Sequence, residues 1–232
     1  MARLFRHPTD APPASEFPVH RAAAGPLELT DERTWSSAHA ITWGADEYRT
    51  TFRALWTDEA LLIRYDCRDR NPWWTIAEHD GRLWDEEVVE IFLDPLRRGV
   101  SYAEVEISPA NVVCDLVVRT PWPSLVSDPA WDWRGLVSRV ATAPTPDGVV
   151  WSATARLPFD GLTSLAEGVS AALPPKPGDR WHFNVFRIKR PGGPHAPERG
   201  AIYAAWSVPA GPSFHDPSCF RDLVFLAHQA PG

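Results

Sequence analysis

The chain has 232 residues, 44% of them hydrophobic, and a formal net charge of −7, so it can bury a sizeable core. The acidic balance argues against a nucleic-acid partner, which would call for a basic patch, and no stretch approaches the ~20 apolar residues of a membrane span. Pro (24 residues) and Trp (12 residues) are both over-represented, and we expect some of the Trp side chains to face a ligand.

The cysteines and the N-terminus give a second set of expectations. Cys67, Cys114 and Cys219 show no CxxC spacing, so the sequence carries no zinc or redox motif of that kind. Buried free thiols are expected, and a Cys67–Cys114 disulfide stays open. Residues 1–8 lack the apolar segment of a secretory signal, so we expect a cytoplasmic protein, an inference that fails if the chain is processed. The sequence does not indicate an oligomeric state.

In chain order, residues 1–30 are rich in Pro and Ala, and we expect an extended N-terminal arm with one edge strand near Glu16–Arg21. Residues 31–232 show no break in composition, which predicts a single domain that begins with a short helical turn or a loop at 31–35. From Thr50 onwards, short strands separated by turn residues are predicted at 51–56, 60–67, 88–93, 102–108, 112–119, 136–142, 149–157, 181–189, 201–208 and 223–226.

Helix is almost absent from this pattern. Only 159–167, which follows Pro158, is predicted to form one or two helical turns. Many short strands without intervening helices are typical of all-β folds. We therefore predict a two-sheet antiparallel β-sandwich of the jelly-roll or immunoglobulin-like kind, with little helix.

The segment 84–95, WDEEVVEIFLDP, places acids on a strongly β-forming run. At period two, Glu90 and Phe92 share one side of the strand, and Val89 and Ile91 share the other, which is predicted to face the core. A face that combines carboxylates with aromatic rings suits a polyhydroxylated ligand, because rings stack on sugar CH faces and carboxylates accept hydrogen bonds from hydroxyls. A solvent-exposed face whose acids are merely hydrated is the alternative.

The strand predicted at 102–108 extends the same argument. Ala103 and Val105 point to one side, and Glu104 and Glu106 to the other. If this strand neighbours 88–93, Glu90 shares a polar face with Glu104 or Glu106. Clustered carboxylates repel one another, so such a face requires cations, protons or hydroxyl donors, and Arg187 is a candidate partner.

Aromatic residues in loops provide further candidates. Trp73 and Trp74 are adjacent, and neighbours in an extended chain point apart, so one of them, here taken as Trp74, is expected to face a cleft or a partner. The Pro- and Gly-rich run 205–220 adds Trp206 and Phe214. In the alternative interpretation, Phe214 only holds this loop against the core.

Five segments in order resemble carbohydrate-binding module family 9, more closely its family 9-like branch within the wider DOMON-like group: 84–95, 102–108 (YAEVEIS), 148–158 (GVVWSATARLP), 183–188 (FNVFRI) and 213–220 (SFHDPSCF). The resemblance runs from about Thr50 to Leu226. It implies a β-sandwich that holds a sugar between two aromatic rings. It also implies Trp84 as the first stacking ring, Glu90 as a hydroxyl-binding carboxylate, and Phe214 in the position of the second ring.

Two positions depart from the family pattern. Glu106 stands where the family has an Arg, and Phe186 stands where it has a Gln. The side chains available for hydrogen bonds therefore differ from those with which the family recognises the reducing end of a sugar chain. Arg187 is the candidate for the missing cation. Structural calcium occurs in the family, but no oxygen-rich loop is specific enough to predict a site, and we expect no cofactor.

We therefore expect a non-catalytic module that binds a mono- or oligosaccharide through Trp84, Glu90, Glu106, Arg187 and Phe214, with Trp206 and Trp74 as further candidates. One alternative is a glycan-active enzyme that uses Glu90 with a neighbouring carboxylate such as Glu86, Glu104 or Glu106. Another is a protein-interaction module that has lost sugar binding. A haem domain with a Met axial ligand is excluded, because Met1 is the only Met.

Overall fold

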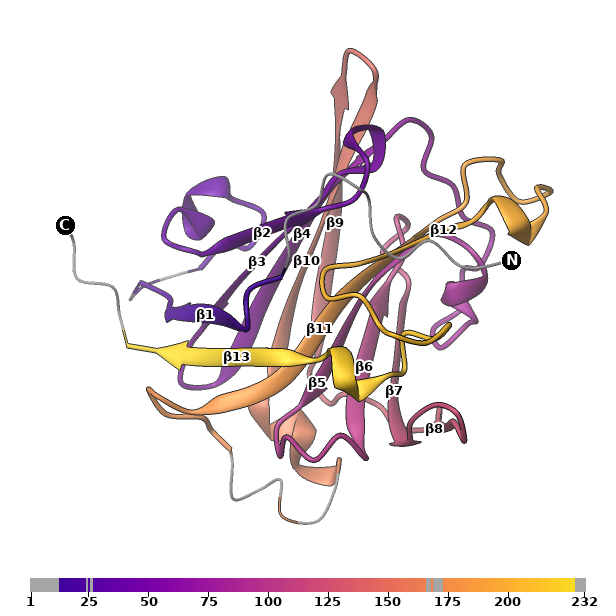
Figure 1. Ribbon diagram of the computed structural model, residues 1–232. Helices are drawn as coiled ribbons and strands as arrows, with labels where there is room; N and C mark the ends of the chain where they lie inside the picture. The colour runs from indigo at the N-terminus through magenta and orange to yellow at the C-terminus, as the bar shows by residue number, and fades with distance from the viewer. Residues whose placement is uncertain (1–12, 24, 26, 166–167, 169–172, 228–232) are drawn as a thin grey trace.

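The computed structural model describes residues 13–23, 25, 27–165, 168 and 173–227. In this part of the chain, thirteen strands form one curled sheet, and the helical segments are short 3-10 turns (Figure 1). The all-β, helix-poor class predicted from the sequence is confirmed. No helix among the described residues is long and apolar enough to cross a membrane. The strands are β1 (Glu16–Arg21), β2 (Ala40–Trp43), β3 (Thr50–Trp56), β4 (Ala60–Asp69), β5 (Val88–Asp94), β6 (Tyr102–Ile107), β7 (Val113–Thr120), β8 (Val126–Asp128), β9 (Val137–Thr145), β10 (Gly148–Pro158), β11 (Arg180–Lys189), β12 (Ile202–Ala205) and β13 (Arg221–Leu226).

The sheet is continuous and mixed, which differs from the predicted pair of antiparallel sheets. Its strands follow the order β8-β7-β6-β5-β11-β13-β1-β3-β4-β10-β9, with β12 beside β11 and β2 beside β3. Neighbours are antiparallel except at β1, which runs parallel to both β13 and β3. The two ends of the sheet curl around a shared core, an arrangement that is consistent with a β-sandwich although the hydrogen-bonded ladder is not split into two sheets.

Strand β1 exists where the sequence predicts it, but it lies inside the sheet rather than at an edge. It pairs with β13 from Glu16 to His20, whereas β3 pairs only with His20 and Arg21. Pro18 therefore lies where β1 has a ladder partner on one side only, the position that suits a residue without an N–H donor. Pro18 thus lies at a locally unpaired edge of a strand that otherwise has neighbours on both sides in the sheet.

The other predicted strands are confirmed at slightly shifted bounds, and β2 and β8 were missed because they are short. The predicted helical turns appear as the 3-10 helices η1 (Glu32–Trp35) and η4 (Phe159–Ser164). Residues 166–167 of the second prediction, and residues 1–12, 24 and 26 of the predicted arm, lie outside the described residues.

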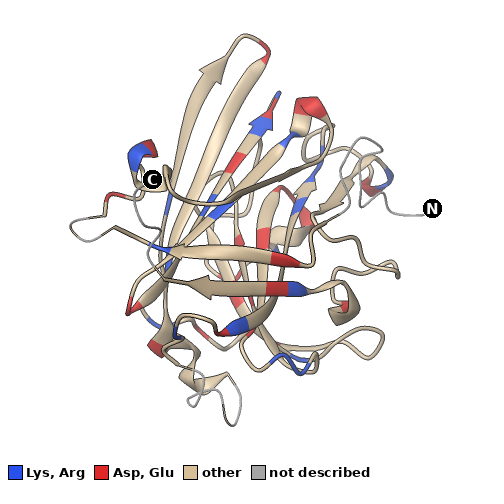
Figure 2. Cartoon of the chain, turned by 60° about the vertical axis from the view of Figure 1, so that its left-hand side comes forward, with Lys and Arg blue, Asp and Glu red and all other residues tan. Residues whose placement is uncertain are grey.

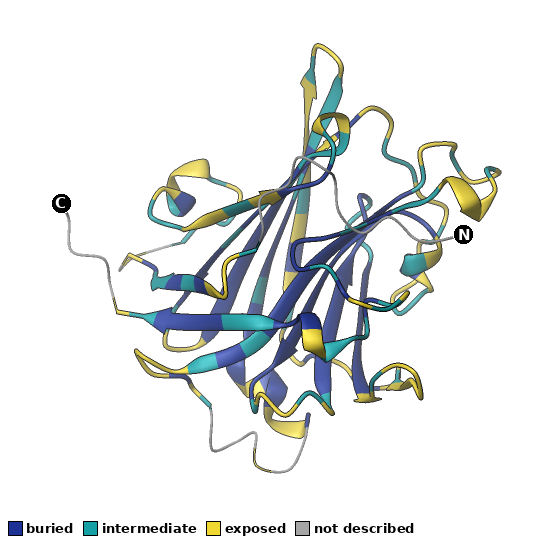
Figure 3. Ribbon diagram, in the orientation of Figure 1, coloured by how far each residue is buried: buried dark blue, intermediate teal, exposed yellow. Residues whose placement is uncertain are grey.

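The inner core lies between the two curled halves of the sheet. It is built from alternate residues of both halves, such as Ile91 and Val105 from one, Phe52 and Trp151 from the other, and Phe183 between them. Central strands are buried throughout their length, and exposure concentrates in turns and in β9 (Figure 3). Burial on both faces means that a second apolar layer covers the outside of β5, β6, β7 and β11.

That second layer, the outer cluster, includes Val88, Phe92, Tyr102, Cys114, Leu116, Phe186, Ile188, Tyr203, Phe214 and Phe220. It forms because the side chains that alternate with inner-core residues along β5, β6 and β11 are also apolar at many positions. All three cysteines are free and buried. Cys67 lies in the inner core and Cys114 in the outer cluster, so a disulfide between them is not formed.

Candidate functional site

Three glutamates meet on the outer face of β5 and β6. In the antiparallel register Glu90 lies opposite Glu106, and Glu104 lies opposite Phe92. One carboxylate oxygen from each of Glu90, Glu104 and Glu106 lies within 4.8 Å of the others. The period-two reasoning that put Glu90 on one face with Glu104 or Glu106 is therefore correct, and all three share it.

These acids are buried, with exposed fractions of 2%, 3% and 1% for Glu90, Glu104 and Glu106. The idea of a hydrated strand face is therefore wrong. The covering loop, residues 206–220, folds across the outer cluster. Phe214 stacks on Phe186 with ring centroids 4.3 Å apart, and His215 stacks on Phe92 at 5.0 Å.

Polar contacts hold the covering loop over the acids. The Tyr102 hydroxyl and His215 Nδ1 are hydrogen-bonded at 3.0 Å, and the Trp122 N–H donates to the carbonyl oxygen of His215 at 3.0 Å. His215 Nδ1 also lies 3.9 Å from a carboxylate oxygen of Glu104. The loop thus places one imidazole beside the glutamates.

A pocket of about 330 Å³ opens above the three glutamates. Its apolar walls come from Trp84, Phe214, Tyr203, Leu116, Leu125 and Ile188, and its polar lining adds Asp85, Ser127, Arg190, Glu198, Ser213 and His215. Trp84 belongs to the 3-10 helix η3 (Leu83–Asp85), just before β5, which places its ring at the pocket. The combination of aromatic walls and a carboxylate floor can stack against a ring and accept hydrogen bonds from its substituents.

Burial dominates the electrostatics of the floor. It raises the pKa of Glu106 well above the ordinary range, and the nearby charges of Glu90 and Glu104 act in the same direction. Burial also raises the pKa of Glu104, against the opposing effect of His215.

Four of the seven predicted site residues come together in this pocket: Trp84, Glu90, Glu106 and Phe214. Trp206 does not, because it packs in the inner core against Phe17 and Phe183. Trp74 is 48% exposed and is not part of the pocket lining. Its neighbour Trp73 is turned the other way, with its Nε1–H donating to the carbonyl oxygen of Arg190 at 2.7 Å.

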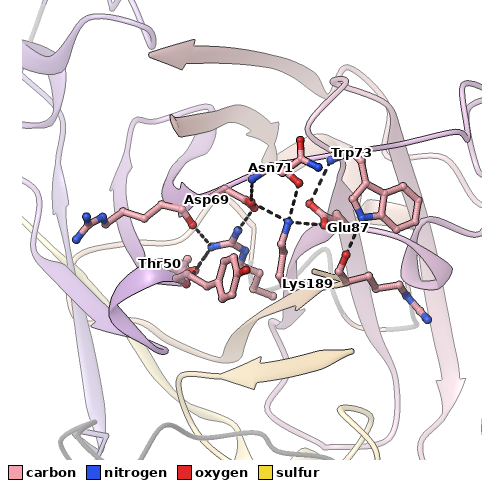
Figure 4. Close-up of polar contacts among 10 residues, drawn as sticks. Thr50, Asp69, Asn71, Trp73, Glu87 and Lys189 are labelled. Carbon is pink, nitrogen blue, oxygen red and sulfur yellow. Dashed lines mark hydrogen bonds and ion pairs between the residues drawn. The ribbon is translucent and has the colours of Figure 1, made fainter. Parts of the chain in front are cut away.

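Arg187 also lies away from the glutamates, so the prediction that it neutralises them is wrong. Along β11, Phe186 and Ile188 face the outer cluster, and Arg187 between them points to the other side of the sheet. There its Nη2 binds Asp69 at 2.5 Å. Lys189 in turn binds Asp69 at 2.7 Å and Glu87 at 2.5 Å (Figure 4). This buried network contains two cations and two anions, so its charges compensate each other.

Sequence reasoning missed several residues that line the pocket. Tyr203 was inside a predicted strand without a role, and Arg190 was given no role. Leu125 belongs to the turn before β8, a strand that was not predicted. The signal available for Tyr203 was its aromatic ring in a short strand near a Gly- and Pro-rich loop.

Two groups of described residues have the donor atoms and spacing to hold a metal ion. Glu90, Glu104 and Glu106 offer only oxygen, which suits a hard cation such as calcium. His79, Asp80 and Asp115 include an imidazole, which suits a transition metal, and the ring nitrogens of His79 lie 3.0 Å from a carboxylate oxygen of Asp80 and 3.3 Å from one of Asp115. The sequence predicts no calcium site, and of the two groups only the glutamates offer the all-oxygen donors that calcium prefers.

Comparisons with known proteins agree with this architecture. Residues 28–107 match the family described as carbohydrate family 9 binding domain-like. A protein of the fungus Arthroderma benhamiae named "Extracellular protein" is 24% identical over 191 residues, 77% of this chain and 79% of that protein. A solved structure from Bacteroides uniformis, of a protein proposed to bind carbohydrate, has a TM-score of 0.66 at 14% identity and covers 91% of this chain and 99% of its own.

Family 9 modules share the fold. The module from Caldicellulosiruptor kristjanssonii in complex with glucose has a TM-score of 0.59 at 15% identity, covering 93% of this chain and 98% of its own. A complex of a family 9 module from that organism with cellotriose gives 0.57 at 16% identity, covering 94% and 98%. The wider DOMON-like grouping stays a prediction. The match over residues 28–107 supports a domain similar to the carbohydrate family 9 binding domain-like family, and the solved structures show that the fold is shared with family 9 modules.

Proposed function

We propose that the pocket above Glu90, Glu104 and Glu106 binds one sugar ring of a mono- or oligosaccharide without catalysing its hydrolysis. The observation that carries this proposal is the combination of an aromatic ring at the pocket, Trp84, a second aromatic wall, Phe214, and a buried carboxylate floor. Family 9 modules of the same fold bind glucose and cellotriose, which supports a sugar as the ligand class.

The layout of the floor argues against a glycoside hydrolase. Such enzymes place their two carboxyl groups on either side of the bond that breaks. Glu90 and Glu106 are instead direct cross-strand partners, and Glu104 extends from the same face of β6. These three carboxylates share one face of the sheet, so as a set they can hold the substituents of a bound ring but do not flank a glycosidic bond from both sides.

The affinity should be modest, about micromolar to millimolar, because sugar hydroxyls exchange bonds to water for bonds to protein with little net gain. A cytoplasmic location stays a prediction from the sequence. The stacking role of Trp84 gives the most direct test of the function.

Replacing Trp84 with alanine should weaken binding at least tenfold, because the ring supplies the apolar surface on which the sugar packs. Calorimetric titration with β-1,4-linked glucose and amino-sugar trimers measures the effect. Trp74→Ala is the matched control, since this Trp is exposed and does not line the pocket, and it should bind as the wild type does. Equal binding by Trp84→Ala and the wild type, or no binding of any trimer by the wild type, would refute the proposal.

A further inference from the structure

An exposed aromatic ring lies next to the pocket. Trp122, in the segment that joins β7 to β8, is 43% exposed and is not part of the pocket lining. A large ring that stays in contact with water forgoes the stabilisation that burial would give it. A half-exposed Trp beside a sugar pocket is therefore a candidate contact for a part of the ligand that extends out of the pocket.

Contacts with the covering loop hold Trp122 in this place. Its N–H donates to the carbonyl oxygen of His215 at 3.0 Å, and His215 lines the pocket. Its ring lies against Gly211, where a Cβ atom would be 3.3–3.7 Å from three carbon atoms of the indole. Because Ser213, which lies between these two loop residues, also lines the pocket, the Trp122 ring is held directly beside it.

Leu125 connects the pocket with Trp122. It is exposed to the same extent as Trp122, and it is a pocket-lining residue, so it stands at the rim where the pocket opens to solvent. Acidic and basic residues are distributed over most of the chain (Figure 2), but residues 120–127, TPWPSLVS, carry no charge. The rim at Trp122 and Leu125 is thus an apolar surface that continues the aromatic walls of the pocket.

We propose that the pocket and Trp122 form two adjacent subsites, so that the preferred ligand is an oligosaccharide with one ring in the pocket and the next ring stacked on Trp122. This inference rests on the proposed sugar-binding function and specifies the size of the ligand. Aromatic rings pack against the CH faces of sugars, and the exposed indole offers such a surface outside the pocket. A monosaccharide fills the pocket alone and leaves this indole in water.

A second sugar ring accounts for the rim better than a protein partner does. A stable protein interface takes roughly 20–30 residues from each side. The rim offers two large apolar side chains, and it is continuous with a pocket that suits a ring. A neighbouring ring of the same sugar chain is brought to the rim by its covalent linkage, so its stacking on Trp122 costs less entropy than the binding of a separate molecule.

The test compares two monosaccharides, glucose and N-acetylglucosamine, each with its own β-1,4-linked trimer. Calorimetric titration of the wild type gives the ratio of trimer affinity to monosaccharide affinity for the pair that binds more tightly. Competition against the trimer measures monosaccharide affinities that are too weak for direct titration. We expect the trimer to bind at least tenfold more tightly, which exceeds the gain from merely offering the pocket more rings.

Three variants assign this preference to the Trp122 ring. Trp122→Ala should lower the ratio of trimer to monosaccharide affinity at least fivefold, because the second ring loses its stacking surface. Trp122→Tyr keeps a smaller ring and should keep part of the preference. Trp74→Ala is the matched control, since Trp74 is exposed to a similar extent but does not line the pocket, and it should keep the full ratio.

A spectroscopic measurement reports on the Trp122 ring directly. Its indole N–H signal is assigned by its absence from the NMR spectrum of Trp122→Ala. This signal should shift when the trimer is added and should stay in place when the monosaccharide is added. A signal that stays in place with both ligands would overturn the inference.

The remaining outcomes separate this inference from the proposed function. Equal binding of trimer and monosaccharide by the wild type, or an unchanged ratio in Trp122→Ala, would overturn the inference and leave the one-ring pocket standing. Equal losses of trimer and monosaccharide affinity in Trp122→Ala would show that Trp122 only holds the covering loop, and would also overturn it. If the wild type binds no trimer and no monosaccharide, the proposed function fails and the inference fails with it.

Discussion

At the scale of single residues, buried charges shape this protein on both faces of β5. Glu87 points toward Lys189 and Asp69, and Glu90 points toward the pocket. Glu87 has the Lys189 ammonium at 2.5 Å, and Glu90 lies on the pocket floor with Glu104 and Glu106. Even with its partner, Glu87 is held in a dry environment, which raises its pKa to about 7, mainly through burial.

The raised pKa of Glu87 predicts a pH-dependent stability. The folded state takes up a proton at about pH 7 and the unfolded state only near the ordinary value of 4.5, so the folded state binds more protons between these values. Stability is therefore lost as pH rises from 4.5 to 7, by about 3 kcal/mol for this group. Urea unfolding of wild type and Glu87→Gln at pH 5 and pH 7.5 measures the difference.

Glu87→Gln should lose less stability over this interval than the wild type. The comparison isolates Glu87, because other groups with raised pKa values, such as Glu106 and Asp115, are present in both proteins. Identical pH slopes for the two proteins would contradict the assignment of the effect to Glu87.

At the scale of elements, the covering loop converts a strand face into a pocket. Asn184 on β11, which is fully buried, binds both ends of this loop. Its side-chain amide donates to the carbonyl oxygen of Ser207 at 2.7 Å and to Cys219 Sγ at 3.2 Å, and its oxygen accepts from the Ser207 N–H at 3.2 Å. One side chain of β11 thus fixes where the loop leaves β12 and where it returns toward β13.

Asn184→Ala should loosen the loop and weaken sugar binding, since Phe214 and His215 reach the pocket only through it. Leaving the N–H and carbonyl groups of Ser207 without these partners should lower the free energy of unfolding by about 1–3 kcal/mol. Hydrogen exchange at residues 207–219 should accelerate, and sugar affinity should fall. Asn71→Ala is the control, because Asn71 is exposed and its hydrogen bonds are formed by the main chain. Unchanged exchange in Asn184→Ala would show that the loop is held by its aromatic contacts alone.

The same loop explains which parts of the site were predictable. Alternation along β5 and β6 correctly placed Glu90, Glu104 and Glu106 on one face, because period two is a local property of strands. Their burial was not predictable, since it comes from residues about a hundred positions later. Applying the same alternation to β11 would have placed Arg187 opposite Phe186, away from the glutamates, so this error was avoidable.

At the scale of the whole molecule, β1 joins the two halves of the sheet. It lies between β13 and β3, and its parallel pairing is the feature that makes one continuous sheet. Strand order of this kind depends on contacts between distant segments, which a sequence pattern of short strands does not specify. Phe17 on β1 contacts residues on both sides of this junction, because its ring centroid lies 5.4 Å from those of Phe52 on β3 and Phe183 on β11.

Phe17 and Phe214 should therefore separate stability from binding. Phe17 is fully buried in the inner core, so Phe17→Ala should lower the free energy of unfolding by about 3–5 kcal/mol. Its affinity for sugar should match the wild type while the protein is folded, because the pocket lies on the opposite face of β11. Phe214→Ala should instead affect binding more than stability, with a clear loss of affinity for sugar, because Phe214 forms a pocket wall. Urea unfolding and sugar titration of both variants, at a temperature where each is folded, provide the comparison. A similar loss of affinity in folded Phe17→Ala would contradict this prediction, because it would mean that the inner core and the pocket are coupled across the sheet.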